Sequence, residues 1–131
     1  MPVEITWLVE DRVLYVKSVD AVTVDELFAA DEQILGELNR VDTPKLHVLL
    51  DDVEQTSQPG LREYNKLQSI RHPKIGWVIE FGTNNKMILF VSSAIVQMFR
   101  IPYRVVQTRE EAIAMLYKAD PSLPRIHEAG N

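Results

Sequence analysis

Two short groups of polar side chains in this chain have the residue types of a binding or switching site. One group follows an apolar run and consists of Asp51, Asp52, Thr56 and Ser57. The other group consists of Thr83, Asn84, Asn85 and Lys86. Both groups precede predicted helix starts, where free backbone N–H groups attract an anion. The same residue types also cap helices and form turns, so the sequence leaves both a phosphate-related role and a structural role open.

The adjacent carboxylates of Asp51 and Asp52 could in principle bind a metal ion or act as an acid–base pair. Neighbouring residues on a strand point to opposite faces, so we expect the two carboxylates not to converge. Ser57 lacks the Gly-x-Ser-x-Gly motif of a nucleophile, and Gly60 and Gly82 do not have the spacing of a phosphate-binding loop. The sequence therefore predicts no metal site, no cofactor, no catalytic residue and no enzymatic activity.

Two further polar side chains interrupt apolar patterns. Asp31 lies between Leu27 and Leu35 on the apolar face of a predicted helix, so its carboxylate must be paired, hydrogen-bonded or open to solvent. We favour a structural pair at the sheet edge. His47 interrupts the apolar run from Leu46 to Leu50. It is interpreted as a satisfied core histidine or as an exposed side chain, with catalysis the least favoured role.

Strands and helices alternate along the chain in the order β-β-α-β-α-β-α-β-α. The predicted strands span residues 5–10, 13–17, 46–50, 75–82 and 103–107, and the predicted helices span 23–40, about 59–70, 87–99 and 108–119. Capping boxes at Thr23 with Glu26 and at Thr108 with Glu111 mark two of the helix starts. This order predicts an α/β domain with a largely parallel sheet and an antiparallel N-terminal hairpin. The domain is expected over residues 1–119, with a polar tail over 120–131.

Composition narrows the classes of function. The chain has 131 residues, 46% hydrophobic and 25% charged, which is typical of one globular domain. It contains no cysteine, so disulfides and thiolate metal sites are excluded. A net charge of −5 argues against nucleic acid as a partner. The N-terminus does not resemble a signal peptide and no apolar run is long enough to span a membrane, so we expect a cytoplasmic protein.

The predicted helix over residues 87–99 is apolar on nearly all sides. One face is interpreted as core and consists of Met87, Val91, Ala94, Ile95 and Met98. The opposite side carries the candidate self-association residues, which are Leu89, Phe90, Ser93 and Val96. A helix of this kind is usually covered on both sides. The second cover could be another copy of the chain, the C-terminal tail or an apolar ligand.

Three stretches, Lys45 to Asp51, Ile75 to Glu80 and Tyr103 to Ala112, carry a family resemblance when taken with the order of the elements. They resemble the STAS superfamily, which includes the SpoIIAA-type anti-sigma-factor antagonists, and within it the divergent SpoIIAA-like branch. That branch shares features with lipid-binding CRAL-TRIO domains. The resemblance covers roughly Ile5 to Ala119 and implies a non-enzymatic regulatory domain that binds other proteins.

The resemblance also implies a candidate phosphorylation site. In phospho-regulated members, the loop after the third strand contains Asp-Ser-Ser/Thr-Gly, and a partner kinase phosphorylates its serine. The corresponding stretch here is Glu54 to Gly60, in which Ser57 or Thr56 lies near that position. The Asp of the motif is missing and Gln58-Pro59 intervenes. A phosphate at this point would add negative charge at a helix start and alter the partner surface.

Two hypotheses for function follow. The first is a regulatory or protein-interaction module that acts through Asp51 to Gly60 and Thr83 to Lys86, with a protein or a second copy of the chain as partner. The second is a binding or sensing domain for a small apolar or anionic ligand, such as a lipid or nucleotide, beside the helix over 87–99. An enzyme built on Asp51, His47 and Asp31 would require these side chains to converge in one pocket.

Overall fold

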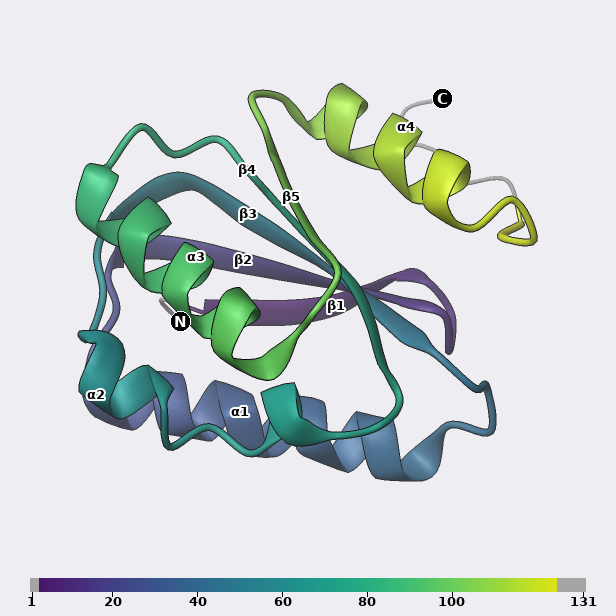
Figure 1. The fold of residues 1–131 in the computed structure, drawn as a ribbon, viewed down its shortest axis with the longest axis horizontal. Coiled ribbons are helices and arrows are strands. Elements are labelled where there is room, and N and C mark those ends of the chain that lie inside the picture. The colour runs from purple at the N-terminus through teal and green to yellow at the C-terminus, as the bar shows by residue number, and fades with distance from the viewer. Residues whose placement is uncertain (1–2, 125–131) are drawn as a thin grey trace.

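A computed structural model of the chain describes residues 3–124, and it shows a single five-stranded sheet with helices on both faces (Figure 1). The strands lie in the order β1-β2-β3-β4-β5. Their bounds are β1 Val3–Val9, β2 Val13–Ala21, β3 Leu46–Ser57, β4 Ile75–Phe81 and β5 Tyr103–Val106. β1 and β2 are antiparallel and the remaining pairs are parallel, which confirms the predicted α/β class.

The helices divide between the two faces of the sheet. Their bounds are α1 Val24–Arg40, α2 Leu61–Tyr64, a 3-10 turn at Ser69–Arg71, α3 Lys86–Phe99 and α4 Arg109–Ala119. α1, α2 and α3 cover one face, and α4 covers the other (Figure 1). Both predicted capping boxes are present, at the starts of α1 and α4. No helix within residues 3–124 has the length and apolar character needed to cross a membrane.

Alternation along the central strands builds a separate core on each face. Leu49 and Ile79 are fully buried and pack with α4, whereas Val48 and Val78 belong to the core on the side of α1 and α3. Successive side chains of a strand point to opposite faces, so β3 and β4 supply both cores at once. Every second residue of β3 points to the same face, so Leu50 and Asp52 lie on the same face as Val48. This alternation directs Asp52 to the side of α1 and α3.

Two predicted boundaries were wrong. β3 does not end before Asp51 and Asp52 but has twelve residues and ends at Ser57. The predicted polar loop after it is therefore strand, because β2 also extends further and pairs with this segment as far as Ala21 with Ser57. The helix predicted over about residues 59–70 is only four residues long, and a separate 3-10 turn follows it.

Helix α3 is rotated about its axis relative to the sequence-based prediction. The side chains that it buries are Ile88, Val91 and Ile95. Met87 and Met98, which the sequence analysis assigned to the core, are 67% and 55% exposed. A helix with apolar residues on nearly all sides has no single stripe to fix its orientation. Packing against the sheet then determines which side chains are buried.

The described part of the expected tail packs against the domain. Leu123 is buried in the core on the α4 face. Asp120 caps the end of α4 and forms an ion pair with Arg12, at 3.1 Å between Oδ2 and Nη2. The domain therefore extends at least to Leu123, beyond the boundary predicted at residue 119. The rest of the predicted tail, residues 125–131, lies outside the described residues.

Candidate functional site

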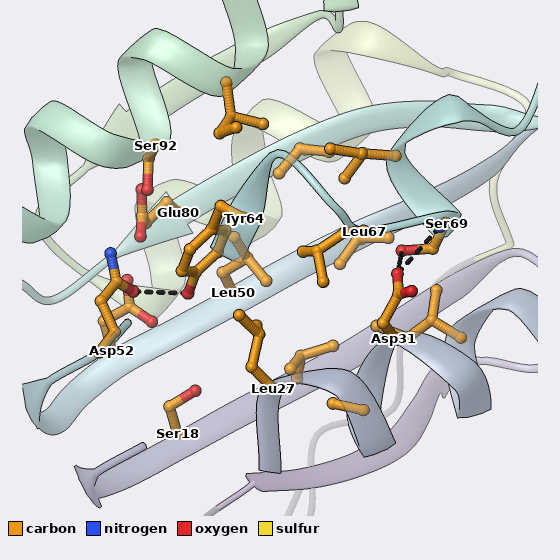
Figure 2. A pocket seen from close by; sticks show the side chains of 18 of the residues that line it. Ser18, Leu27, Asp31, Leu50, Asp52, Tyr64, Leu67, Ser69, Glu80 and Ser92 are labelled. Carbon is orange, nitrogen blue, oxygen red and sulfur yellow. Dashed lines mark hydrogen bonds between the residues drawn. The ribbon is translucent and has the colours of Figure 1, made fainter. Parts of the chain in front are cut away.

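An apolar cavity of about 150 Å³ lies between the sheet and the helices α1, α2 and α3. Its wall consists mainly of aliphatic side chains from the sheet, from α1 and α3 and from the segment after α2, including Val16, Leu27, Leu50, Leu67, Val78 and Ile95. Figure 2 shows polar side chains gathered at the two ends of the cavity. Asp52, Glu80 and Ser92 lie at one end, and Asp31 and Ser69 lie at the other. The cavity therefore has an apolar middle and two polar ends.

Asp52 and Glu80 form the more unusual of these ends. They are 4% and 2% exposed, and they are carried by the neighbouring parallel strands β3 and β4. In the register of these strands Leu50 pairs with Glu80. Asp52 follows Leu50 on the same face, which brings the two carboxyl groups into a side-chain hydrogen bond. Two carboxyl groups can share such a bond only when one of them holds a proton.

Burial is the main reason why this pair retains a proton. It disfavours the ionised form, and together with the hydrogen bond to Glu80 and the negative charge of Glu80 it raises the pKa of Asp52 to about 10. Asp52 is therefore protonated at neutral pH, and the pair carries one proton and one negative charge. A carboxylic acid held neutral in an apolar site can donate or accept a hydrogen bond to a ligand.

Few protein groups donate hydrogen bonds to the Asp52 and Glu80 carboxyl groups. The Tyr103 hydroxyl donates to Glu80 Oε1 and is itself hydrogen-bonded to Ser92. The nearby Tyr64 hydroxyl donates to Gln58 Oε1 instead, at 2.7 Å. Asp52 Oδ2 is buried and accepts no hydrogen bond from any donor within the described residues. Unsatisfied buried polar atoms are rare in native proteins, and one that lines a cavity is a natural contact point for a ligand.

The opposite end of the cavity is fully satisfied. Asp31 Oδ1 accepts from the Ser69 backbone N–H at 2.9 Å and from the Ser69 hydroxyl at 2.5 Å (Figure 2). Asp31 Oδ2 accepts from the Gln68 N–H at 2.9 Å. The carboxylate thus holds the segment that leads into the 3-10 turn against α1. Asp31 is hydrogen-bonded to backbone rather than paired with a charge, and its role is structural.

The first predicted group of site residues is divided between the two faces of the sheet. Asp51 lies on the α4 face, where its Oδ2 accepts from the Tyr15 hydroxyl at 2.6 Å. Burial, followed by this bond, raises the pKa of Tyr15 to about 12. Asp52 faces the cavity, so the prediction that the two carboxylates diverge is confirmed. Thr56 and Ser57 are exposed residues at the end of β3, where the Ser57 carbonyl accepts from the Val22 N–H at 3.0 Å.

The second predicted group forms the turn before α3 and meets the first group. Asn85 is the N-cap of α3, and its side-chain oxygen accepts from the Met87 N–H at 2.9 Å. Its side-chain N–H donates to the Thr56 carbonyl at 3.2 Å, which joins the two stretches at the carboxyl edge of the sheet. Thr83 is buried and accepts from the Asn85 N–H. Asn84 and Lys86 are exposed. These contacts are those of a capped helix start.

The four predicted self-association residues do not share one outward surface. Phe90 is 60% exposed, whereas Leu89 and Ser93 are half-buried. Val96 lines the cavity and packs in the core on that face. Self-association through these four side chains stays a prediction, in which Phe90 is the most exposed member and Val96 also contributes to the cavity wall.

His47 is a satisfied core histidine. Its Nδ1 accepts from the Trp77 backbone N–H at 2.9 Å, which leaves Nε2 to donate to Asp120 Oδ2 at 2.9 Å. Hydrogen bonds from Ser122 and from His47 hold the pKa of Asp120 well below its usual range. His47, Asp31 and Asp51 occupy separate places in the fold. Within residues 3–124 no group of three or more acidic or histidine side chains could hold a metal ion.

Glu80 is the site residue that the sequence analysis missed. The sequence does contain an indication of its role. Val78 and Glu80 are two residues apart and therefore lie on one face of their strand, as Leu50 and Asp52 do on theirs. Two acidic residues that end the same face of adjacent parallel strands are candidates for a close pair. The register of β3 against β4, which decides whether they meet, is a property of the folded sheet.

The fold is similar to that of a solved structure. It matches the crystal structure of an uncharacterized protein from the DUF3478 family with a SpoIIAA-like fold, from Shewanella loihica PV-4, with a TM-score of 0.64. The match covers 87% of this chain and 91% of that chain at 16% sequence identity. No family model and no curated protein matches the sequence. This chain therefore has a SpoIIAA-like fold, and the similarity says nothing about a ligand or partner.

Proposed function

We propose that this SpoIIAA-like domain is a non-enzymatic module that binds or senses a small, largely apolar ligand in the cavity beneath α1, α2 and α3. The observation that carries the proposal is that Asp52, a residue lining an apolar cavity, has a buried Oδ2 that accepts no hydrogen bond from the described protein groups. Apolar walls with a few polar groups at defined points are the usual form of a small-ligand site. The ligand would place its apolar body in the middle of the cavity and its polar group at Asp52.

The composition of the cavity supports an apolar ligand and disfavours an anionic one. Asp31, Asp52 and Glu80 line it, and no lysine, arginine or histidine does so among residues 3–124. A phosphate or carboxylate would enter a low-dielectric space that already carries negative charge. Of the apolar and anionic ligands that the sequence left open, the site favours the apolar kind.

A second candidate function is protein interaction at the carboxyl edge of the sheet. Exposed apolar side chains lie near both predicted groups of site residues. Val53, within Asp51 to Gly60, is 60% exposed, and Met87 and Phe90, in the helix that follows Thr83 to Lys86, are 67% and 60% exposed. Exposed apolar groups of this kind often mark interfaces. Light scattering of wild-type protein and of Phe90→Asp would test self-association. A dimer that dissociates in the variant would support it, and a wild-type monomer would argue against it.

The cavity itself is tested with a probe that has no polar group. Toluene is titrated into the protein while the methyl NMR signals of cavity residues such as Val48 and Ile95 are followed. We expect saturable shifts of these signals in wild-type protein and none in Val78→Phe, in which the larger side chain occupies the cavity. The matched control is Val53→Phe, which places the same change on an exposed residue and should bind as wild type does. Absence of binding to wild type, or unchanged binding to Val78→Phe, would contradict the proposal.

A further inference from the structure

The end of the cavity at Asp52 and Glu80 carries negative charge without a counter-charge. Both side chains are almost completely buried, so water does little to stabilise that charge. Buried charges in proteins are normally paired with an opposite charge or bound to a metal. Neither compensation is available here from residues 3–124, because no basic side chain lines the cavity and no metal-binding group is present.

Hydrogen bonds at this end are also incomplete, since both Asp52 Oδ2 and the Gln58 Nε2 donor are buried without a partner among the described residues. An ionised carboxylate has about four acceptor positions on its two oxygens. The Tyr103 hydroxyl supplies one donor to Glu80, and Asp52 Oδ2 has none. The Tyr64 hydroxyl, the other phenol at this end, is committed to Gln58. Burial is the main cause that raises the pKa of Tyr64, with a further contribution from the neighbouring carboxyl groups, so that hydroxyl stays neutral. This end of the cavity thus has buried negative charge, an acceptor with no donor at Asp52 Oδ2 and one unpaired amide donor at Gln58.

We infer that the ligand is a small apolar amine whose protonated nitrogen lies against the Asp52 and Glu80 carboxyl groups. The inference rests on the proposed function, because it assigns a ligand class to the same cavity. An ammonium group brings the positive charge that this end of the cavity lacks, and its three N–H donors can reach the carboxyl oxygens. The proton shared by Asp52 and Glu80 leaves them a single negative charge, so a singly charged amine completes a neutral group.

The size of the cavity limits the amine to a small one. A volume of about 150 Å³ is comparable to that of an apolar protein cavity that holds one benzene molecule. A six-membered ring with one short arm would fill the space, with the ring against the aliphatic wall and the arm directed to Asp52. At the opposite end the Asp31 carboxylate already accepts three hydrogen bonds from Gln68 and Ser69, whereas Asp52 Oδ2 accepts none from the described residues. The orientation of the ligand is therefore set by Asp52 and Glu80.

The inference is tested with three ligands of nearly equal shape and different charge. Benzylamine, benzyl alcohol and benzoate are titrated into wild-type protein at neutral pH, and affinities are taken from calorimetry or methyl NMR. We expect benzylamine to bind at least about tenfold more tightly than benzyl alcohol, since charge-assisted hydrogen bonds are about twice as strong as neutral ones. Benzoate should bind most weakly of the three.

A variant without the negative charge of Glu80 tests whether this side chain causes the preference for benzylamine. Glu80→Gln keeps an acceptor oxygen for Tyr103 but removes the negative charge. We expect the affinity for benzylamine to fall to that for benzyl alcohol in this variant. The control is Glu32→Gln, which removes the same charge from an exposed position on α1 and should preserve the preference. The wild-type ligand series is decisive alone, so the test does not depend on the folding of Glu80→Gln.

The outcomes separate this inference from the proposed function. Equal affinity for benzylamine and benzyl alcohol, or tighter binding of benzoate, would overturn the amine assignment while leaving a ligand-binding cavity in place. If none of the three ligands binds and toluene also fails to bind, the cavity is not a binding site and both statements fall. Preference for benzylamine that persists in Glu80→Gln would place the cation elsewhere and overturn the inference.

Discussion

The Asp52 and Glu80 carboxyl groups are hydrogen-bonded to each other between the parallel strands β3 and β4, on the face that lines the cavity. Each belongs to a run of alternating side chains that is otherwise apolar, so a pair of acids replaces hydrophobic packing at one end of the core. Burying such a pair costs stability. That cost suggests a functional reason for its presence, and it also makes the pair measurable through the pH dependence of folding.

Stability should fall as pH rises because of Asp52. Its pKa is raised from 3.8 to about 10, so the folded state binds a proton that the unfolded state releases over this range. Between about pH 5 and pH 8 the free energy of unfolding should therefore decrease more steeply for wild type than for Asp52→Asn. The difference in slope should approach about 1.4 kcal/mol per pH unit. Urea unfolding at several pH values measures it, and parallel curves for the two proteins would contradict the assignment of the proton.

The Tyr103 hydroxyl should contribute more to stability than the Tyr64 hydroxyl. Tyr103 donates to a carboxyl of the charged pair, whereas Tyr64 donates to a neutral amide. Hydrogen bonds to charged groups contribute roughly 1.5–3 kcal/mol and neutral ones roughly 0.5–1.5 kcal/mol. Denaturant unfolding of Tyr103→Phe and Tyr64→Phe should show the larger loss in Tyr103→Phe. Equal losses in the two variants would contradict this prediction.

Asp31 should be a structural residue. Asp31→Ala leaves the Gln68 and Ser69 backbone N–H groups without their acceptor, and it should destabilise the protein by roughly 2–4 kcal/mol. The neighbouring Glu32→Ala, at an exposed position, should change stability by less than about 0.5 kcal/mol. Hydrogen exchange should localise the loss to the segment around Ser69. A small effect of Asp31→Ala on stability would show that this carboxylate is not needed to hold the segment.

Two glycines should respond in opposite directions to alanine. Gly82 has a φ of +92°, and a Cβ there would lie 2.4 Å from Val53 Cγ2 and 3.0 Å from the Val53 backbone. Gly82→Ala should therefore destabilise the protein by roughly 1–3 kcal/mol. Gly36 lies within α1 with no atom within 4 Å of an added Cβ, so Gly36→Ala should stabilise by up to about 1 kcal/mol. The thermal unfolding temperatures of the two variants test both predictions. A Gly82→Ala variant that is more stable than wild type would contradict the prediction that a Cβ at this position is strained.

Much of the fold could be predicted because it depends on local patterns. The capping boxes at Thr23 and Thr108 mark helix starts within a few residues of sequence. Alternation along β3 and β4 predicts buried strands, and the same alternation correctly separates Asp51 from Asp52. The errors arose where long-range pairing decides the outcome. Thr56 and Ser57 are strand residues because β2 extends beside them, and no local feature of the polar sequence indicates that extension.

The candidate site was predicted only in part for the same reason. Asp52 was identified as a polar residue at the end of a strand, but its partner Glu80 was not. Their contact requires the register of two strands that are separated by α2 and the 3-10 turn. The orientation of α3, which places Val96 at the cavity, depends on packing because apolar residues surround that helix. A cavity is a property of how elements meet, and a pattern along one element does not specify it.

The central claim is that a small ligand occupies the cavity with its polar group at Asp52 and Glu80. The most direct measurement is a set of isotope-filtered nuclear Overhauser effects between bound benzylamine and the protein. We expect the ring protons to contact the methyl groups of Leu27 and Ile95, and the methylene beside nitrogen to lie nearest Glu80 and Tyr103. Contacts confined to the exposed methyl group of Met87, or no contacts under conditions of saturation, would contradict the claim.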